Sequence, residues 1–377
     1  TYWETVLAFQ DLTGDEWDYA ESVDSAAMRD MAKTLEAVGR KCDDVRLKER
    51  FAYQYIRIMF ALNEYKQCRQ AWENGGEQWQ DTVLRKQGRL YYAGALFYTG
   101  ELCKAADIYG ECSDWNSLRF FKGKLEFMQE LYNYNPRSKA LMFFVQNYEN
   151  SYQDGKNVDV KKFTDFCKQV LKEKKTDNPA MWQAALAHIA FLDRDYAKAI
   201  EMIEKACNMD GDQIVKDNAR FLRLVYHAAD TKASNYDDLL YVDLPWLLKK
   251  VNEADEYHSK NGNGYAHFIN ILRRVVFVYA FPHYVDTGNH NMAAAILNAY
   301  DEQFCYNKQH RAELRSNPNE TGSWDYSTFY FNYLDTTSVE NVKDFLAFVK
   351  SRGKTNLEKS LISFGYVNES MMNELIG

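Results

Sequence analysis

The stretch from Asn178 to Asp212 constrains the fold of this chain more than any other part of its sequence. It contains two helical patterns, at 180–192 and 196–208, in which apolar residues recur with the spacing of a helix. The polar turn Asp193-Arg194-Asp195 separates them, and Pro179 stands where the first helix would begin, a position that tolerates proline. The stretch therefore predicts two amphipathic helices that fold back on each other.

The two helices would meet along one apolar face each. These faces hold Leu186, Ala187 and Ala190 on the first helix and Ala199, Ile203 and Ala206 on the second. The small side chains of Ala187 and Ala199 allow the helices to approach closely. We expect Tyr196 to fill the turn between them.

Weaker copies of this hairpin occur earlier in the chain, around the turns Asn63-Glu64 and Thr99-Gly100. Cys68, Ala105 and Ala199 take equivalent positions, and their numbers differ by 37 and then by 94. A period of about 34 residues is typical of stacked helical hairpins, and longer intervals indicate longer or inserted helices. Apolar residues match around the two turns: Tyr55, Ile56, Met59, Cys68 and Trp72 around the first, and Tyr92, Ala93, Leu96, Ala105, Tyr109 and Cys112 around the second.

At these residues the chain resembles the tetratricopeptide repeat family. The segments 100–109 and 194–203 match the turn and second helix of that repeat, and 288–295 looks like a degenerate copy. The family's closing proline is missing, since Gly211 stands in its place, and Ile56 replaces the small residue of the first helix in the earliest copy. The resemblance implies an all-α fold: a tetratricopeptide-like α/α superhelical solenoid with irregular inserted helices.

The resemblance also implies a function, because such solenoids bind a protein or peptide on the concave face formed by their first helices. Carried over position by position, the predicted groove is aromatic and carries cations, but it lacks the Lys and Asn pattern that clamps a peptide carboxylate. Alternatively, these aromatic residues pack against inserted helices. The groove residues are Arg50, Tyr53, Arg57, Phe60, Gln87, Leu90, Phe97, Tyr98, Met181, His188 and Phe191.

The composition supports a helical chain, since only 5 prolines and 18 glycines occur in 377 residues. We expect the repeat region to span 1–316. Residues 317–377 would then form a loop and C-terminal helices that continue the array beyond the sequence. Within this part, 327–333 is aromatic enough for a short strand or a buried turn.

The formal charge of −8 disfavours a nucleic-acid partner, since binding phosphates requires a clustered basic surface. The sequence contains no run of 18 apolar residues and therefore predicts no membrane span. The seven cysteines form no C-x-x-C or zinc spacing, and we expect them to be buried free thiols. The chain begins with Thr1, so we expect any N-terminal signal to have been removed, and both the cytoplasm and a bacterial periplasm or envelope stay open as locations.

Motifs that would indicate catalysis, a cofactor or a metal site are missing from the sequence. Gly353-Lys354-Thr355 resembles the end of a phosphate-binding loop, but Phe348 occupies the position of its first glycine and a helical pattern precedes it. We expect a turn between helices there. The seven histidines form no pair four residues apart that would suit a metal. These observations predict a non-enzymatic scaffold without a cofactor or a metal.

One enzymatic alternative stays open, namely an α/α-barrel enzyme that acts on carbohydrate, or a related glycan-binding protein. The chain is acidic and rich in tryptophan and tyrosine, and aromatic rings stack on sugars. Glycoside hydrolysis requires two carboxylates on either side of the bond that is cleaved. The candidates are Asp15, Glu16 and Asp18 around Trp17, and Asp325 beside Trp324.

Overall fold

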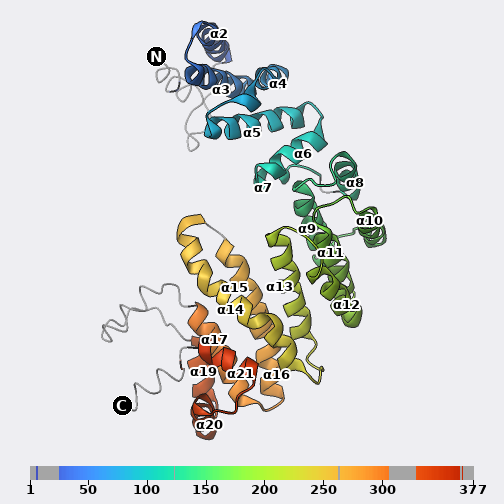
Figure 1. The fold of residues 1–377 in the computed structure, drawn as a ribbon, viewed down its shortest axis with the longest axis vertical. Coiled ribbons are helices and arrows are strands. Elements are labelled where there is room, and N and C mark those ends of the chain that lie inside the picture. The colour runs from blue at the N-terminus through green and yellow to red at the C-terminus, as the bar shows by residue number, and fades with distance from the viewer. Residues whose placement is uncertain are drawn as a thin grey trace, which may run out of the picture. The chain divides into compact units, whose positions relative to one another are not determined.

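The computed structural model describes residues 25–122, 124–261, 264–304 and 328–365, together with Val6 and Val367 (Figure 1). Every regular element in these ranges is a helix, and they contain no strand, so the all-α fold class is confirmed. The chain forms two compact units, Thr1–Asp177 and Asn178–Gly377. The domain boundary predicted at 316/317 lies outside the described residues and stays a prediction.

In the first unit, the α-helices between residues 25 and 111 each pack against the next one in the sequence (Figure 1). Several begin at an aspartate whose carboxylate accepts a hydrogen bond from a backbone N–H of the first turn, as Asp44 does from Leu47 at 2.9 Å. Such a cap satisfies a donor that the helix itself leaves free. The elements are α2 (Ser25–Lys41), α3 (Val45–Ala61), α4 (Tyr65–Glu73), η1 (Gly76–Gln78), α5 (Thr82–Tyr98), α6 (Leu102–Glu111), α7 (Trp115–Leu118), α8 (Leu125–Tyr134), α9 (Ala140–Gln153) and α10 (Val160–Glu173).

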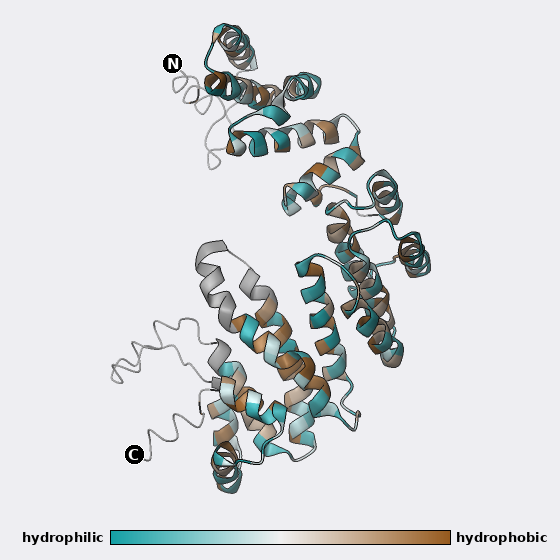
Figure 2. Cartoon of the chain, viewed as in Figure 1, coloured by the Kyte–Doolittle hydropathy of each residue, from teal (hydrophilic) through white to brown (hydrophobic). Residues whose placement is uncertain are grey.

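The second unit has one continuous hydrophobic core, built around α13, α14 and α17. In both units the hydrophobic residues gather on the helix faces that are turned toward other helices (Figure 2). The elements are α11 (Pro179–Leu192), α12 (Tyr196–Cys207), α13 (Gln213–Ala229), α14 (Tyr236–Asn261), α15 (Gly264–Arg274), the π-helix η2 (Val275–Ala280), α16 (Phe281–Asp286), α17 (His290–Phe304), α19 (Thr328–Thr336), α20 (Val339–Lys350) and α21 (Asn356–Phe364).

One turn geometry recurs at the three predicted hairpins and at the degenerate copy. A residue with positive φ follows the first helix, and the next backbone N–H donates to the carbonyl five residues before it, which is a common way to end a helix. The positive-φ residues are Asn63 (59°), Gly100 (90°), Arg194 (64°) and Gly288 (72°). The hydrogen bonds run from Glu64 to Met59 (2.8 Å), Glu101 to Leu96 (3.0 Å), Asp195 to Ala190 (2.9 Å) and Asn289 to Tyr284 (2.8 Å).

A small, fully buried residue follows each of these turns at the same offset. These residues are Cys68, Ala105, Ala199 and Ala293. The turn geometry alone is less specific, because α6 and α9 end in the same way at Ser113 and Gly155. The combination of turn and small residue is compatible with a helical repeat.

Three details differ from the sequence predictions. The helix α11 is not amphipathic: 10 of its 14 residues are buried, because it packs against both α12 and α13. Tyr196 does not fill the turn, since it is 45% exposed and lies beside Phe191 with ring centroids 5.4 Å apart. The segment 327–333 is not a strand or a buried turn, because its described part lies in α19, which packs on α17.

The Gly353-Lys354-Thr355 motif connects α20 to α21, as the sequence predicted. Thr355 caps α21 by accepting from the Glu358 backbone N–H, and the Glu358 carboxylate accepts from the Thr355 backbone N–H. Lys354 is buried and donates to the Ser351 carbonyl. The backbone groups and the lysine of this segment thus serve the helix connection.

Candidate binding site

The first helices of the two N-terminal hairpins, α3 and α5, pack against each other and bring part of the predicted groove together. The Tyr53 hydroxyl on α3 donates a 2.7 Å hydrogen bond to Gln87 Oε1 on α5. The Tyr53 and Tyr91 rings meet edge to face at 6.1 Å. These contacts show that α3 and α5 run parallel. Tyr53 on α3 lies beside α5 residues that are 34 and 38 positions later in the sequence, namely Gln87 and Tyr91.

Aromatic rings continue along the α3–α5 contact as far as the turns. Phe60 lies 5.3 Å from Tyr91 and 6.1 Å from Tyr98, both edge to face. Tyr98 in turn stacks on Tyr65 at 4.4 Å. We call the set Tyr53, Phe60, Tyr65, Tyr91 and Tyr98 the aromatic stripe. Aromatic contacts of this kind contribute roughly 0.5–1.5 kcal/mol each, so the stripe stabilises its own shape.

Access to the stripe differs along its length. Tyr98 is 59% exposed, Phe60, Tyr65 and Tyr91 are half-buried, and Tyr53 is buried. The close fit at Phe60 requires a glycine, because a Cβ added at Gly94 would lie 2.6 Å from Phe60 Cε2. The stripe is thus a preformed surface of aromatic edges and faces with its most exposed ring at one end.

The other predicted groove residues of this unit differ in whether they lie beside the stripe. Arg57 belongs beside the stripe, with its guanidinium 5.8 Å from the Tyr53 ring and a 2.9 Å hydrogen bond to Gln54 Oε1. Arg50 and Leu90 are half-buried on the same two helices. Phe97 contacts Tyr98 but also packs at 4.8 Å against Phe121, beyond α7.

Sequence reasoning missed Tyr65 and Tyr91. The signal for Tyr91 was its position four residues after Gln87 on the same helical face. Tyr65 begins the second helix of its hairpin, so a prediction limited to first helices omitted it.

The groove residues of the second unit are mostly covered by α13. Phe191 is buried and stacks on Tyr226 at 4.4 Å. The Tyr226 hydroxyl lies 3.1 Å from His188 Nδ1, and burial, with Arg274 nearby, lowers the pKa of His188 to about 4. Met181 is half-buried. These contacts match the alternative in which first-helix aromatics pack against a further helix.

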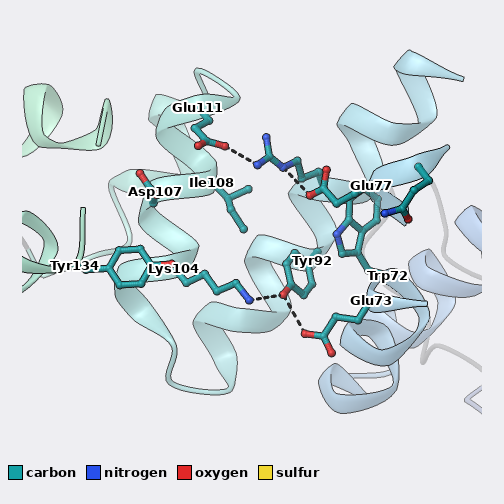
Figure 3. A pocket seen from close by; sticks show the side chains of 11 residues that line it. Trp72, Glu73, Glu77, Tyr92, Lys104, Asp107, Ile108, Glu111 and Tyr134 are labelled. Carbon is teal, nitrogen blue, oxygen red and sulfur yellow. Dashed lines mark hydrogen bonds and ion pairs between the residues drawn. The ribbon is translucent and has the colours of Figure 1, made fainter. Parts of the chain in front are cut away.

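A pocket of about 400 Å³ opens on the other side of α5, between α4, η1 and α6 (Figure 3). Two networks of charged side chains cross it. Lys104 Nζ donates to the Tyr92 hydroxyl at 2.8 Å, and that hydroxyl donates to Glu73 Oε1 at 3.0 Å. Arg89 bridges Glu77 at 3.1 Å and Glu111 at 2.5 Å.

Most of the pocket's aromatic and acidic side chains already contact one another or a neighbour. The aromatic residues Trp72 and Tyr92 are buried against each other, with centroids 6.0 Å apart, and the third, Tyr134, is 53% exposed. Asp107 accepts hydrogen bonds from Asn135 Nδ2 at 3.2 and 3.0 Å. The carboxylates Asp15, Glu16, Asp18 and Asp325 proposed for the enzymatic alternative lie outside the described residues.

Two wider searches were confined to the residues that the structure describes. No group of three or more histidine, cysteine or carboxylate side chains in these ranges is arranged to hold a metal ion. None of the helices searched is long and apolar enough to cross a membrane. The six cysteines in the described ranges are free, and only Cys68 and Cys167 among them are fully buried.

Comparison of the chain with protein-family models, with curated proteins and with solved structures finds no match. The resemblance to tetratricopeptide repeats therefore rests on the residues that carry it.

Proposed function

We propose that this chain is a non-enzymatic scaffold that binds a protein or peptide partner on the aromatic stripe of its first unit. One observation carries the proposal, namely that five aromatic side chains from α3, α4 and α5 form a contiguous surface that is partly exposed. Tyrosine is enriched at protein interfaces because its ring buries apolar area and its hydroxyl can still hydrogen-bond.

The position of the stripe supports the same role. It lies on the first helices of adjacent hairpins, which is where the resemblance to tetratricopeptide repeats implies a partner. Its rings are held by each other and by Gly94, so a partner would bind a surface that needs little ordering. A glycan-binding role has weaker support, because Trp72 and Tyr92 in the pocket are buried and only Tyr134 among its aromatic residues is exposed.

A site-specific photo-crosslinking experiment tests the proposal. A photoreactive phenylalanine analogue replaces Tyr98 in the full chain and, as a matched control, Tyr134, which lines the pocket and is 53% exposed. In a lysate of the source cells we expect a discrete protein adduct from position 98 and none from position 134. Equal adducts at both positions, or none at position 98, would refute the stripe as the binding surface. Unchanged thermal melting of both variants serves as the folding control.

A further inference from the structure

A surplus of positive charge surrounds the helix α10. Residues 154–175 contain seven lysines, no arginine and four acidic residues, so this stretch has a formal charge of +3. The whole chain has a net charge of −8, which leaves −11 for the rest of it. The stretch is therefore a basic patch in an acidic protein.

Each of the four acidic residues in this stretch already has a lysine partner. Three lysines remain after this pairing, namely Lys161, Lys172 and Lys174. All three are exposed, and no carboxylate of the described residues pairs with any of them. The four pairs are Asp154–Lys156 at 3.3 Å, Asp159–Lys162 at 3.2 Å, Asp165–Lys168 at 3.8 Å and Glu173–Lys175 at 3.1 Å.

The lysines of α10 lie on the side opposite to its buried residues. Lys161, Lys168 and Lys172 are separated by seven and four residues, so they share one face of the helix. With a rise of 1.5 Å per residue they stand roughly 10 Å and 6 Å apart along the axis. Lys174 follows directly as the C-cap. The buried residues on the other side are Phe163, Phe166, Cys167 and Val170.

This exposed face offers charge rather than apolar area to a ligand. No large hydrophobic side chain between residues 135 and 195 is exposed. The aromatic rings of α10 are engaged inside the unit, since Phe163 stacks on Tyr148 at 4.5 Å and Phe166 meets Tyr132 edge to face at 5.6 Å. A ligand of this face would therefore be held by its negative charge.

We propose that the exposed face of α10 is a second interaction surface, which binds an acidic segment of a partner protein. Carboxylates of the segment would pair with Lys161, Lys172 and Lys174. A lysine ammonium has three donors on a flexible stem, so it can reach carboxylates at different spacings. This surface is separate from the aromatic stripe and does not rest on the function proposed for the stripe.

Nucleic acids also bind lysines, but two features of this face oppose them. It has no exposed aromatic ring on which a base could stack, and α10 has no arginine that would bind a phosphate through two hydrogen bonds. A long polyanion would also extend beyond the patch and meet the repulsion of the remaining charge of −11. A short acidic segment can stay within the patch.

An anionic membrane surface is the third ligand class that attracts lysines. A helix that lies on a membrane buries its apolar face among the lipids. The apolar face of α10 is already covered within the unit, so only the lysines could contact a membrane. The negative charge of the rest of the chain would be repelled by such a surface. Packing and charge together favour a protein segment.

Fluorescence anisotropy with the full chain at low salt tests the inference. The probe is a labelled 12-residue peptide that alternates Glu with Ser, and two control peptides replace every Glu by Lys or by Gln. The test variant reverses the three unpaired lysines by the changes Lys161→Glu, Lys172→Glu and Lys174→Glu. The matched control makes the same change in net charge at three exposed lysines outside the patch, by Lys48→Glu, Lys66→Glu and Lys198→Glu. Thermal melting checks the folding of both, and Lys161→Gln with Lys172→Gln is a milder second test variant.

We expect the Glu peptide to bind, and both control peptides to bind at least about tenfold more weakly. The test variant should lose about tenfold in affinity, equivalent to about 1.4 kcal/mol, because reversal replaces attraction by repulsion. The matched control should stay within about threefold of wild type, since its changes alter only the distant charge. Equal losses in both variants, no loss in the test variant, or equal binding of the Glu and Gln peptides would overturn the inference.

The remaining outcomes separate other ligands and the function proposed for the stripe. A 12-nucleotide single strand, or vesicles of phosphatidylserine and phosphatidylcholine, would overturn the assignment if either bound more tightly than the Glu peptide and lost that binding in the test variant. Self-association that the test variant abolishes would overturn it in favour of a second copy of the chain. Failure of the Glu peptide to bind would refute this inference alone, because crosslinking at position 98 tests the stripe separately.

Discussion

The charged cluster around Asp243 gives the sharpest prediction for the second unit. Asp243 on α14 is fully buried, and it accepts hydrogen bonds from Arg223 Nε at 2.7 Å and from Arg220 Nε at 2.8 Å. Arg223 also pairs with Glu204 on α12 at 3.1 Å, and Arg220 lies 3.8 Å from the centroid of the Trp246 ring. Burial lowers the pKa of Arg223, but Asp243 outweighs this effect and raises the pKa overall. One carboxylate thus holds two cations between α12, α13 and α14.

The change Asp243→Ala removes that carboxylate and leaves the two guanidinium groups. Breaking a buried ion pair by removing one partner costs about 3–5 kcal/mol. The side chains of Arg220 and Arg223 are 32% and 15% exposed, and Arg223 keeps Glu204, so part of their charge can be solvated. We therefore expect a loss of roughly 3 kcal/mol in the free energy of unfolding. For a unit of this size, each kcal/mol lowers Tm by about 2–4 °C, which gives a drop of about 6–12 °C.

Urea unfolding, followed by far-ultraviolet circular dichroism, measures this loss in the free energy of unfolding. If the chain unfolds in more than one transition, the relevant one is the transition whose midpoint the substitution changes. The control is Asp238→Ala, an exposed aspartate on the same helix, for which we expect a change within about 0.5 kcal/mol. A loss below about 1 kcal/mol for Asp243→Ala would show that the cluster contributes little to stability. It would refute the view that a buried, ionised Asp243 balances the charges of Arg220 and Arg223.

Three further predictions concern single residues in the two units. Burial raises the pKa of the Glu149 carboxyl from 4.5 to about 8. The folded chain therefore retains a proton that the unfolded chain releases, and stability should fall as pH rises from about 4.5 to about 8. Glu149→Gln should flatten this decline in urea titrations at several pH values, and an unchanged slope would contradict it. Arg194→Gly should stabilise the chain by roughly 1 kcal/mol, because Arg194 has a φ of 64°, which glycine adopts without a steric cost. Lower stability than wild type in chemical denaturation would count against that expectation. Gly94→Ala should cost about 1–3 kcal/mol, since the new Cβ would overlap the Phe60 ring. Gly353→Ala, with nothing within 4 Å of its added Cβ, should be nearly neutral in the same measurement, and equal losses would argue against a tight α3–α5 contact.

Much of the local structure could be predicted from the sequence alone. The polar turns after the first helices, and the small residue five positions after Asn63, Gly100, Arg194 and Gly288, placed the hairpins correctly. Local chemistry suffices there, because a residue with positive φ ends one helix and a small side chain lets the next helix approach. The two compact units and the helical state of α19 were not predicted, since both depend on which helices pack together.

The candidate site shows the limit of prediction from the sequence most clearly. Phe60, Phe97 and Phe191 all stand three residues before their turn residue, so the sequence gives them one role. In the structure Phe60 joins the aromatic stripe, Phe97 packs on Phe121, and Phe191 is buried against Tyr226. The sequence determines that an aromatic ring stands at this corner of the hairpin. Only the tertiary structure decides whether the ring stays accessible, because exposure depends on the next element that packs over it, and that contact is not encoded in the hairpin.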